Sequence, residues 1–132
     1  MASEVRIAVR GDMDVTKAVL YTVEQAQEAG FDEVAGRMIA TATSELARNL
    51  LHHAGSGEIR LRILDERGRH GIQIQARDQG PGIPDVERAM RDHFSTAGTL
   101  GLGLPGVERL MDELQVESTV GTGTCVTARK YL

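Results

Sequence analysis

The sequence of 132 residues contains no tryptophan, a single cysteine (Cys125) and only two lysines, and 3% of its residues are aromatic. A lone cysteine cannot form an internal disulfide, which is typical of proteins in a reducing cytoplasm. No apolar run approaches the roughly 20 residues of a membrane span, and the first residues lack the apolar core of a secretory signal. We therefore expect a cytoplasmic protein that binds no membrane.

The sequence also lacks the features of a nucleic-acid-binding protein. Its formal net charge is −4, and the arginines are scattered singly between acidic residues instead of forming a basic stripe. Aromatic side chains on which bases stack are almost absent. This composition favours proteins or small molecules as partners and excludes nucleic acid.

The length of 132 residues predicts one domain that spans residues 1–132. Hairpin-linked strands, combined with helices that are grouped and do not alternate with the strands, predict an α+β fold with two layers. Ile59, Leu61 and Ile63 alternate with arginines and are expected to face the core. The predicted elements are a strand at 4–9, helices at 15–29 and 32–54, strands around 59–63 and 72–76 joined by a turn at 66–71, a loop at 79–85, helices at 85–92 and 105–114, and strands at 115–119 and up to 131.

The second predicted helix carries two polar residues where apolar ones are expected. At roughly 100° per residue, Asn49 falls about 20° from Ala42, within the apolar stripe, and Glu45 lies at its edge, about 60° away. An unpaired buried amide costs about 1–3 kcal/mol. Either Asn49 bonds a backbone carbonyl and Glu45 reaches solvent, or a cleft opens where both act on a metal–phosphate group. The stripe itself is predicted to consist of Met38, Ala42, Leu46 and Leu50.

Three further stretches bear on this choice: DQGPGIP at 78–84, FSTAGTLGLGLPG at 94–106 and GTGT at 121–124. Asp78 ends a predicted strand, and the glycines that follow it admit a ligand close to the backbone. The second stretch contains G-x-G-x-x-G, but no Val/Ile-rich strand precedes it, so it is not a dinucleotide fingerprint. It also lacks the G-K-[ST] of a Walker A loop, and the chain lacks the V-A-I-K and H-R-D motifs of eukaryotic-type kinases.

Taken together and in this order, the motifs resemble those of the GHKL superfamily of ATPases and kinases. SELARN (44–49) resembles its N box, DQGPGI (78–83) and STAGTLGLGL (95–104) its two glycine boxes, and GTGT its last motif. Within the superfamily the chain is most similar to the switch serine/threonine kinases of bacterial stressosomes. The resemblance covers nearly the whole chain and implies the Bergerat fold, a mixed, mostly antiparallel sheet with helices on one face and ATP beneath a glycine-rich lid.

The resemblance also implies a role for each motif residue. Asn49 corresponds to the Mg²⁺ ligand and Glu45 to the catalytic base that accepts or orients the proton of the nucleophile. Asp78 corresponds to the carboxylate that hydrogen-bonds the adenine amino group, and Thr124 supports that contact. The other implied ATP-binding residues are Gly80, Gly82 and Ile83 of the first glycine box and Thr99, Leu100, Gly101, Leu102, Gly103 and Leu104 of the lid.

This resemblance implies an ATP- and Mg²⁺-dependent kinase that phosphorylates Ser or Thr on STAS-domain antagonist and scaffold proteins and, once released from them, activates a PP2C-type phosphatase. A direct anti-sigma-factor kinase and a nucleotide-binding adapter without turnover remain alternatives, although an adapter has no need of Glu45. A histidine-kinase catalytic domain or a topoisomerase-type ATPase would need further segments that we do not expect.

The motifs assign no role to several other residues. Arg48 either neutralises phosphate charge or lies on the surface, and the sequence leaves both open. His52 and His53 point in different directions on a helix and have no Cys/His partners, so we expect no zinc site. The methionines Met38, Met90 and Met111 are expected to pack in the core.

Overall fold

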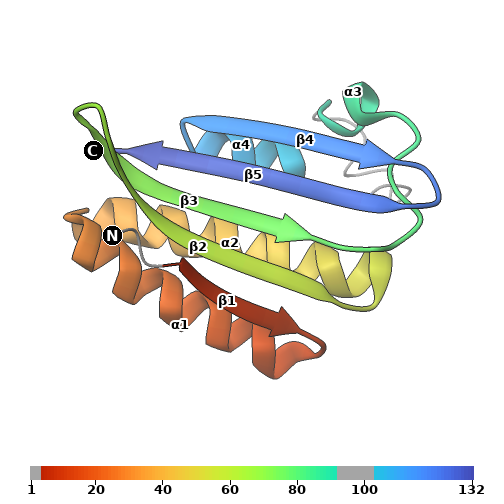
Figure 1. The fold of residues 1–132 in the computed structure, drawn as a ribbon, viewed down its shortest axis with the longest axis horizontal. Coiled ribbons are helices and arrows are strands. Elements are labelled where there is room, and N and C mark those ends of the chain that lie inside the picture. The colour runs from red at the N-terminus through yellow and green to blue at the C-terminus, as the bar shows by residue number, and fades with distance from the viewer. Residues whose placement is uncertain (1–3, 92–102) are drawn as a thin grey trace.

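The computed structural model describes residues 4–91 and 103–132 and consists of an antiparallel sheet with helices on one side (Figure 1). Neighbouring strands pair in the order β1-β2-β3-β5-β4, and every pair among the described residues is antiparallel. The predicted α+β sandwich is confirmed. A mixed, mostly antiparallel sheet was expected, and the described residues contain no parallel pair. The strands are β1 (Glu4–Val9), β2 (Gly57–Glu66), β3 (Arg69–Arg77), β4 (Glu113–Thr119) and β5 (Gly123–Tyr131).

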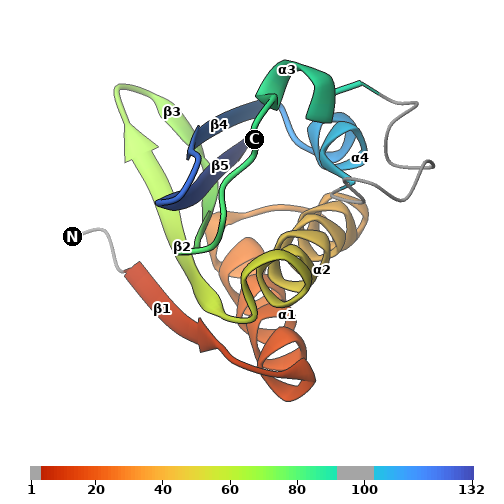
Figure 2. The same cartoon turned by 90° about the vertical axis from the view of Figure 1, so that its right-hand side faces the viewer.

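The long helices α1 (Asp12–Ala29) and α2 (Glu33–Ala54) pack side by side against the same face of the sheet (Figure 2). The short helices are α3 (Val86–Ala89) and α4 (Leu104–Leu110). Within the described ranges, no helix is both long enough and apolar enough to cross a membrane.

The start and end of α2 follow from its flanking residues. The side chain of Asp32 accepts a hydrogen bond of 2.8 Å from the backbone N–H of Ala35, which satisfies one of the free donors of the first turn. Gly55 ends the helix in the left-handed conformation, and its N–H donates to the carbonyl of Leu51. The last helix is shorter than the predicted 105–114, because Met111 is already extended and β4 begins at Glu113.

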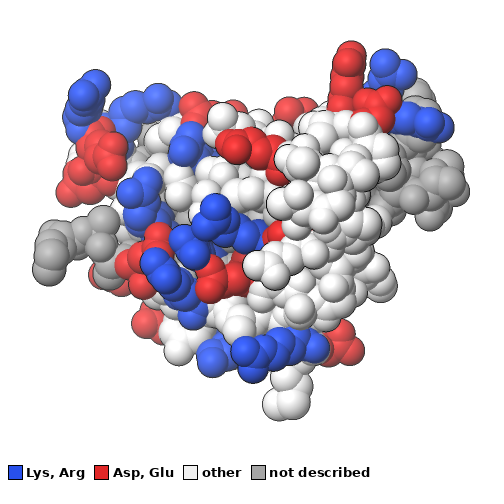
Figure 3. Space-filling model, turned by 45° about the vertical axis from the view of Figure 1, so that its right-hand side comes forward, with Lys and Arg blue, Asp and Glu red and all other residues white. Residues whose placement is uncertain are grey.

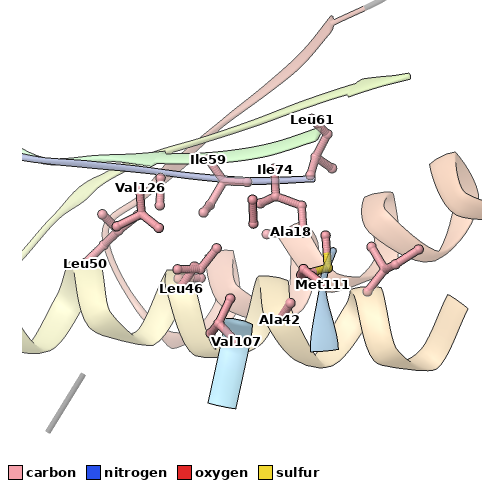
Figure 4. Packing of buried hydrophobic residues seen from close by; sticks show 14 of the residues in the cluster. Ala18, Ala42, Leu46, Leu50, Ile59, Leu61, Ile74, Val107, Met111 and Val126 are labelled. Atoms are coloured by element: carbon pink, nitrogen blue, oxygen red, sulfur yellow. The ribbon is translucent and has the colours of Figure 1, made fainter. Parts of the chain in front are cut away.

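The core lies between the two long helices and the sheet. Leu46 and Leu50 of α2 face Ile59, Ile74 and Val126 of three neighbouring strands, and Figure 4 shows these side chains packed together. Truncation of a buried leucine of this kind to alanine costs about 2–5 kcal/mol. The packing of these two leucines against the strands fixes the rotation of α2 about its axis, and therefore which side of α2 faces the end of the sheet.

Two predicted core positions are wrong by one residue. Met38 is half-buried and Ile39 is fully buried in its place, because α2 packs against α1 as well as against the sheet and its buried surface is therefore wider than one stripe. Ile63 is likewise half-buried, whereas Leu64, which lies opposite Gly71, is buried. Of the three methionines expected in the core, Met111 is buried, and Met38 and Met90 are half-buried.

A buried polar contact joins the two long helices. Oγ1 of Thr22 on α1 lies 2.9 Å from Oγ1 of Thr43 on α2 and 2.8 Å from the carbonyl oxygen of Ala18. Both threonines are fully buried, so the hydroxyls satisfy each other where water does not reach. The contact fixes how the two helices lie against each other.

Candidate functional site

A pocket opens between the second half of α2, the ends of β3 and β5, and the start of α4. The empty space that it outlines is about 450 Å³ when the open solvent at its mouth is included. Asn49 and Asp78, which are 29 positions apart in the sequence, both line it. The other lining residues are Leu46, Leu50 and His53 of α2, Ala76, Pro81, Gly82 and Ile83 from β3 and the following loop, Leu104, and Thr124 and Val126 of β5.

The carboxylate of Asp78 is held by backbone groups. Its Oδ1 accepts hydrogen bonds from the N–H of Gly80 at 2.9 Å and of Thr124 at 3.2 Å. None of the hydrogen bonds found among residues 4–91 and 103–132 uses Oδ2. The carboxylate is half-buried and lines the pocket, and its Oδ2 can still accept a hydrogen bond from a ligand.

The loop after Asp78 requires glycine at position 82. Gly82 has φ +81°, and a Cβ there would lie 2.5 Å from the carbonyl oxygen of Thr119. Any side chain would push the loop away from the end of β4. The loop is fastened at two further points, because the N–H of Gly121 donates to the carbonyl of Pro81 and the N–H of Ile83 donates to Oγ of Ser118.

Ser118 is a residue of this site that sequence reasoning missed. Its Oγ accepts from the N–H of Ile83 at 2.7 Å, lies 2.8 Å from Oγ1 of Thr124 and 3.3 Å from the carbonyl oxygen of Gly123. One hydroxyl thus joins two predicted ATP-binding residues that are 41 positions apart. No local motif marks Ser118, because its role comes only from the pairing of β4 with β5.

Asn49 and Glu45 lie one helical turn apart on α2, and both are half-buried. Asn49 lines the pocket, whereas Glu45 does not. Glu45 instead faces the start of α4, since a Cβ built at Gly103 would lie 2.9 Å from its Oε2. Gly103 has φ +61° and is the N-cap of α4, so the carboxylate lies beside the backbone where the predicted lid ends.

The remaining predicted site residues are placed as follows. Gly80 is half-buried and binds Asp78 through its N–H, and Leu104 is buried and lines the pocket. Thr99, Leu100, Gly101 and Leu102 lie outside the described residues. Within the described ranges, no group of three or more His, Cys, Asp or Glu side chains is placed to hold a metal ion.

Two residues that the sequence left without a role are now placed. His53 lies one turn beyond Asn49 and lines the same pocket, a position that the i, i+4 spacing from Asn49 indicates. Arg48 is exposed and lines a different hollow, between α1 and α2, together with Asp12 and His52. Its position favours a surface role over contact with a ligand in the Asn49–Asp78 pocket.

The fold and the site motifs agree with a known family. The sequence model of the family called histidine kinase-like ATPase domain matches residues 10–130, so the chain belongs to this family. The GHKL resemblance of the four motifs is thereby confirmed.

Individual proteins of known name show which members of this family the chain is similar to. The chain is 46% identical over 126 residues to the serine/threonine-protein kinase RsbT of Bacillus subtilis strain 168, and the match covers 96% of this chain and 95% of that protein. It is 42% identical over 102 residues to an anti-sigma F factor of Caldanaerobacter subterraneus, covering 71% of this chain and 68% of the relative. An anti-sigma F factor of Thermoanaerobacter sp. strain X514 is 37% identical over 98 residues, with the same coverage. The predicted similarity to a bacterial serine/threonine-protein kinase is confirmed.

Proposed function

We propose that this chain is an ATP- and Mg²⁺-dependent serine/threonine protein kinase of a bacterial partner-switching module. In this proposal it phosphorylates STAS-domain antagonist and scaffold proteins and, when released, activates a PP2C-type phosphatase. The proposal is supported by the similarity to RsbT over 96% of the chain. The observation that carries it is that Asn49 and Asp78 line one pocket between α2 and the sheet.

The pocket has suitable chemistry for the base of ATP at one end. Oδ2 of Asp78 is an acceptor for an adenine amino group, while Oδ1 is held by the backbone of Gly80 and Thr124. The apolar side chains of Leu50, Ala76 and Val126 line the same pocket and favour a flat aromatic base. Ser118 and Thr124 hold the wall of the pocket in place through their hydroxyl contact.

The phosphate end of ATP is assigned to Asn49, Glu45 and the lid at positions 99–104. The amide oxygen of Asn49 fits Mg²⁺, which takes few protein oxygens together with phosphates and water. Bound Mg²⁺ would neutralise charge on the transferring phosphoryl group. Glu45, one turn earlier on the same helix, would accept or orient the proton of the substrate hydroxyl. Its position beside Gly103 supports this role, because Gly103 belongs to the predicted lid.

The proposed function is tested by phosphate transfer. The purified chain, Mg²⁺ and ATP labelled at the γ-phosphate are incubated with a purified STAS-domain protein, and the phosphosite is identified by mass spectrometry. Label on a serine or threonine, lost in a Glu45→Gln variant that still binds ATP, supports the kinase. Tight binding of the STAS protein and of ATP without any label would overturn the kinase in favour of a nucleotide-binding adapter.

A direct anti-sigma-factor kinase is the second candidate, because two relatives named anti-sigma F factor match 71% of the chain. The two candidates differ in the partner that is bound in the unphosphorylated state. Co-purification with a sigma factor, with displacement by the unphosphorylated STAS protein, favours the anti-sigma kinase. Stimulation of a PP2C-type phosphatase by the free chain favours the switch kinase.

A further inference from the structure

The face of the sheet opposite the helices has an ordered distribution of charge. The outward side chains form three rows that run across the strands, and each row contains one side chain from every strand. The three central strands, β2, β3 and β5, contribute four arginines and one glutamate to these rows, whereas the edge strands β1 and β4 contribute three glutamates and one arginine. The rows are Glu4–Arg62–Gln73–Arg129–Glu113, Arg6–Arg60–Gln75–Thr127–Gln115 and Ala8–Glu58–Arg77–Cys125–Glu117.

We call the four central arginines, Arg60, Arg62, Arg77 and Arg129, the arginine face. No described helix covers it (Figures 1 and 2). In the space-filling view of Figure 3, Lys and Arg side chains gather over this part of the molecule with acidic side chains among them. The positive centre contrasts with the net charge of −4 of the whole chain.

The arginine face is a packed layer. Gln73 and Thr127 are only 9% exposed although they point away from the helices, so neighbouring side chains lie over them. Nε of Arg129 donates to Oε1 of Gln73 at 2.8 Å, and Nε2 of Gln75 donates to Oγ1 of Thr127 at 3.2 Å. Side chains that are already ordered lose less entropy when a partner binds.

The members of the arginine face differ in whether they form ion pairs with described residues. Arg60 pairs with Glu58, and Arg129 pairs with Glu113 at 3.5 Å. Arg62 and Arg77, in contrast, form no ion pair with any described residue, and Nε of Arg62 is buried without a hydrogen-bond partner among them. Arginine is the basic residue preferred for ion pairs at interfaces.

From this layer we infer that the arginine face is a docking surface for an acidic segment of a protein partner, whose carboxylates bind the guanidinium groups of Arg62 and Arg77. Arginine clusters recognise acidic motifs through paired N–H···O hydrogen bonds. The strip from β2 to β5 spans two strand spacings, about 10 Å, which matches one extended segment or one helix. Glutamates on both edge strands repel a wider polyanion such as a nucleic-acid duplex.

The docking surface is separate from the proposed ATP pocket but adjoins it. A groove at the Arg77 end of the face is lined by Arg60, Arg77, Glu117 and Cys125, and also by Asp78 and Thr124, which line the pocket on the other side. The docking surface would thus give the proposed kinase a second binding site, for a protein partner, that does not depend on ATP. Its failure and that of the kinase are distinguishable, because one is measured with a peptide and the other with ATP.

The test uses the full chain and a fluorescein-labelled decaglutamate peptide, with binding followed by fluorescence anisotropy at low and physiological salt. We expect an Arg62→Gln/Arg77→Gln variant to bind about tenfold more weakly or worse, because two positive charges that form no ion pair with described residues are lost. A Lys17→Gln/Arg37→Gln variant removes the same charge from exposed positions on α1 and α2 and is expected to bind within about twofold of the native chain.

Three further measurements distinguish loss of the docking surface from loss of the fold and from binding of any polyanion. The ATP affinity of the Arg62→Gln/Arg77→Gln variant is expected to be unchanged, which shows that it is folded, and an Arg62→Lys/Arg77→Lys variant retains part of the peptide affinity. Equal peptide binding by the glutamine variant and the native chain would overturn the proposal. Binding of a decameric single-stranded RNA as tight as that of the peptide would also overturn it, since the surface would then select any polyanion.

Discussion

Asp78 and Thr124 hold each other through two reciprocal hydrogen bonds at the ends of β3 and β5. The N–H of Asp78 donates to the carbonyl oxygen of Thr124 at 2.9 Å, and the N–H of Thr124 donates to Oδ1 of Asp78 at 3.2 Å. The N–H of Gly80 adds a third bond to the same oxygen. The position of this carboxylate is therefore set by the backbone of the sheet, and the chemistry of its other oxygen can be changed without moving it.

Substitution of Asp78 by Asn tests the adenine contact directly. The amide oxygen can replace Oδ1 and keep the backbone bonds, while an NH₂ group replaces Oδ2 and turns an acceptor into a donor. We expect the affinity for ATP to fall by about 10- to 100-fold, because a hydrogen bond to a charged group contributes roughly 1.5–3 kcal/mol. Isothermal titration with ATP and Mg²⁺ measures the loss.

The control for this substitution is Asp65→Asn, which removes the same charge from an exposed position near the β2–β3 hairpin. Its ATP affinity should equal that of the native chain. An Asp78→Asn protein that binds ATP as tightly as the control would remove Asp78 from the adenine site.

Substitution of Glu45 by Gln separates nucleotide binding from phosphate transfer. Glu45 does not line the pocket but faces Gly103, so its loss should leave the affinity for ATP within about threefold. Transfer to the STAS protein should fall by about 10²- to 10⁴-fold, the usual contribution of a general base. The measurement compares the ATP affinity with the single-turnover transfer rate. Native transfer rates would exclude Glu45 from the mechanism, and Glu33→Gln, at an exposed position on the same helix, is the matched control.

The sequence predicted the helices and strands well because their signals are local. The alternation of Ile59 and Leu61 and the glycines that end the two long helices each act within a few residues. Errors arose where a second packing partner decides burial, as for Met38 and Ile39, since the surface of α2 that faces α1 leaves no separate trace in the helical period.

The candidate site was predictable to the extent that its residues belong to motifs. Asn49, Asp78 and Thr124 come from three separate motifs, and the structure brings them to one pocket. Ser118 was not predictable, because an isolated serine in a strand carries no signal until β4 is paired with β5. The grouping of Arg62 and Arg77 on one face was also hidden, since arginines that are scattered along the chain come to the same face only through sheet register.

Substitution of Ser118 by Ala tests whether this hydroxyl supports the pocket. It leaves the N–H of Ile83 without its acceptor and removes the contact with Oγ1 of Thr124. We expect a loss of about 1–3 kcal/mol in the free energy of unfolding and a severalfold weaker affinity for ATP. Urea unfolding and ATP titration measure the two effects. Ser118→Thr, which keeps the hydroxyl, should restore most of the affinity, and an alanine variant with native values would show that Ser118 has no part in the site.

Tyr131 makes stability depend on pH in the alkaline range. Burial and the hydrogen bond that its Oη donates to Glu113 raise the pKa of Tyr131 above its ordinary value of 10.0. Because the folded state binds this proton more tightly than the unfolded state, the stabilisation is complete below pH 10 and is lost as the pH rises through the folded-state pKa. Urea unfolding between pH 8 and 11 should show a steeper decline for the native chain than for Tyr131→Phe. Identical declines would contradict the raised pKa.

The buried threonine pair between the long helices gives a prediction about stability that is independent of the pocket. Substitution of Thr43 by Val keeps the shape of the side chain but removes the hydroxyl that lies 2.9 Å from Oγ1 of Thr22. Thr22 keeps its contact with the carbonyl of Ala18, so only one net hydrogen bond is lost, and we expect the free energy of unfolding to fall by about 1 kcal/mol. Thr41→Val, at an exposed position on the same helix, is the control and should cost less, because water replaces its bond to Arg37. Equal urea midpoints for the two variants would show that the buried contact does not stabilise the α1–α2 interface.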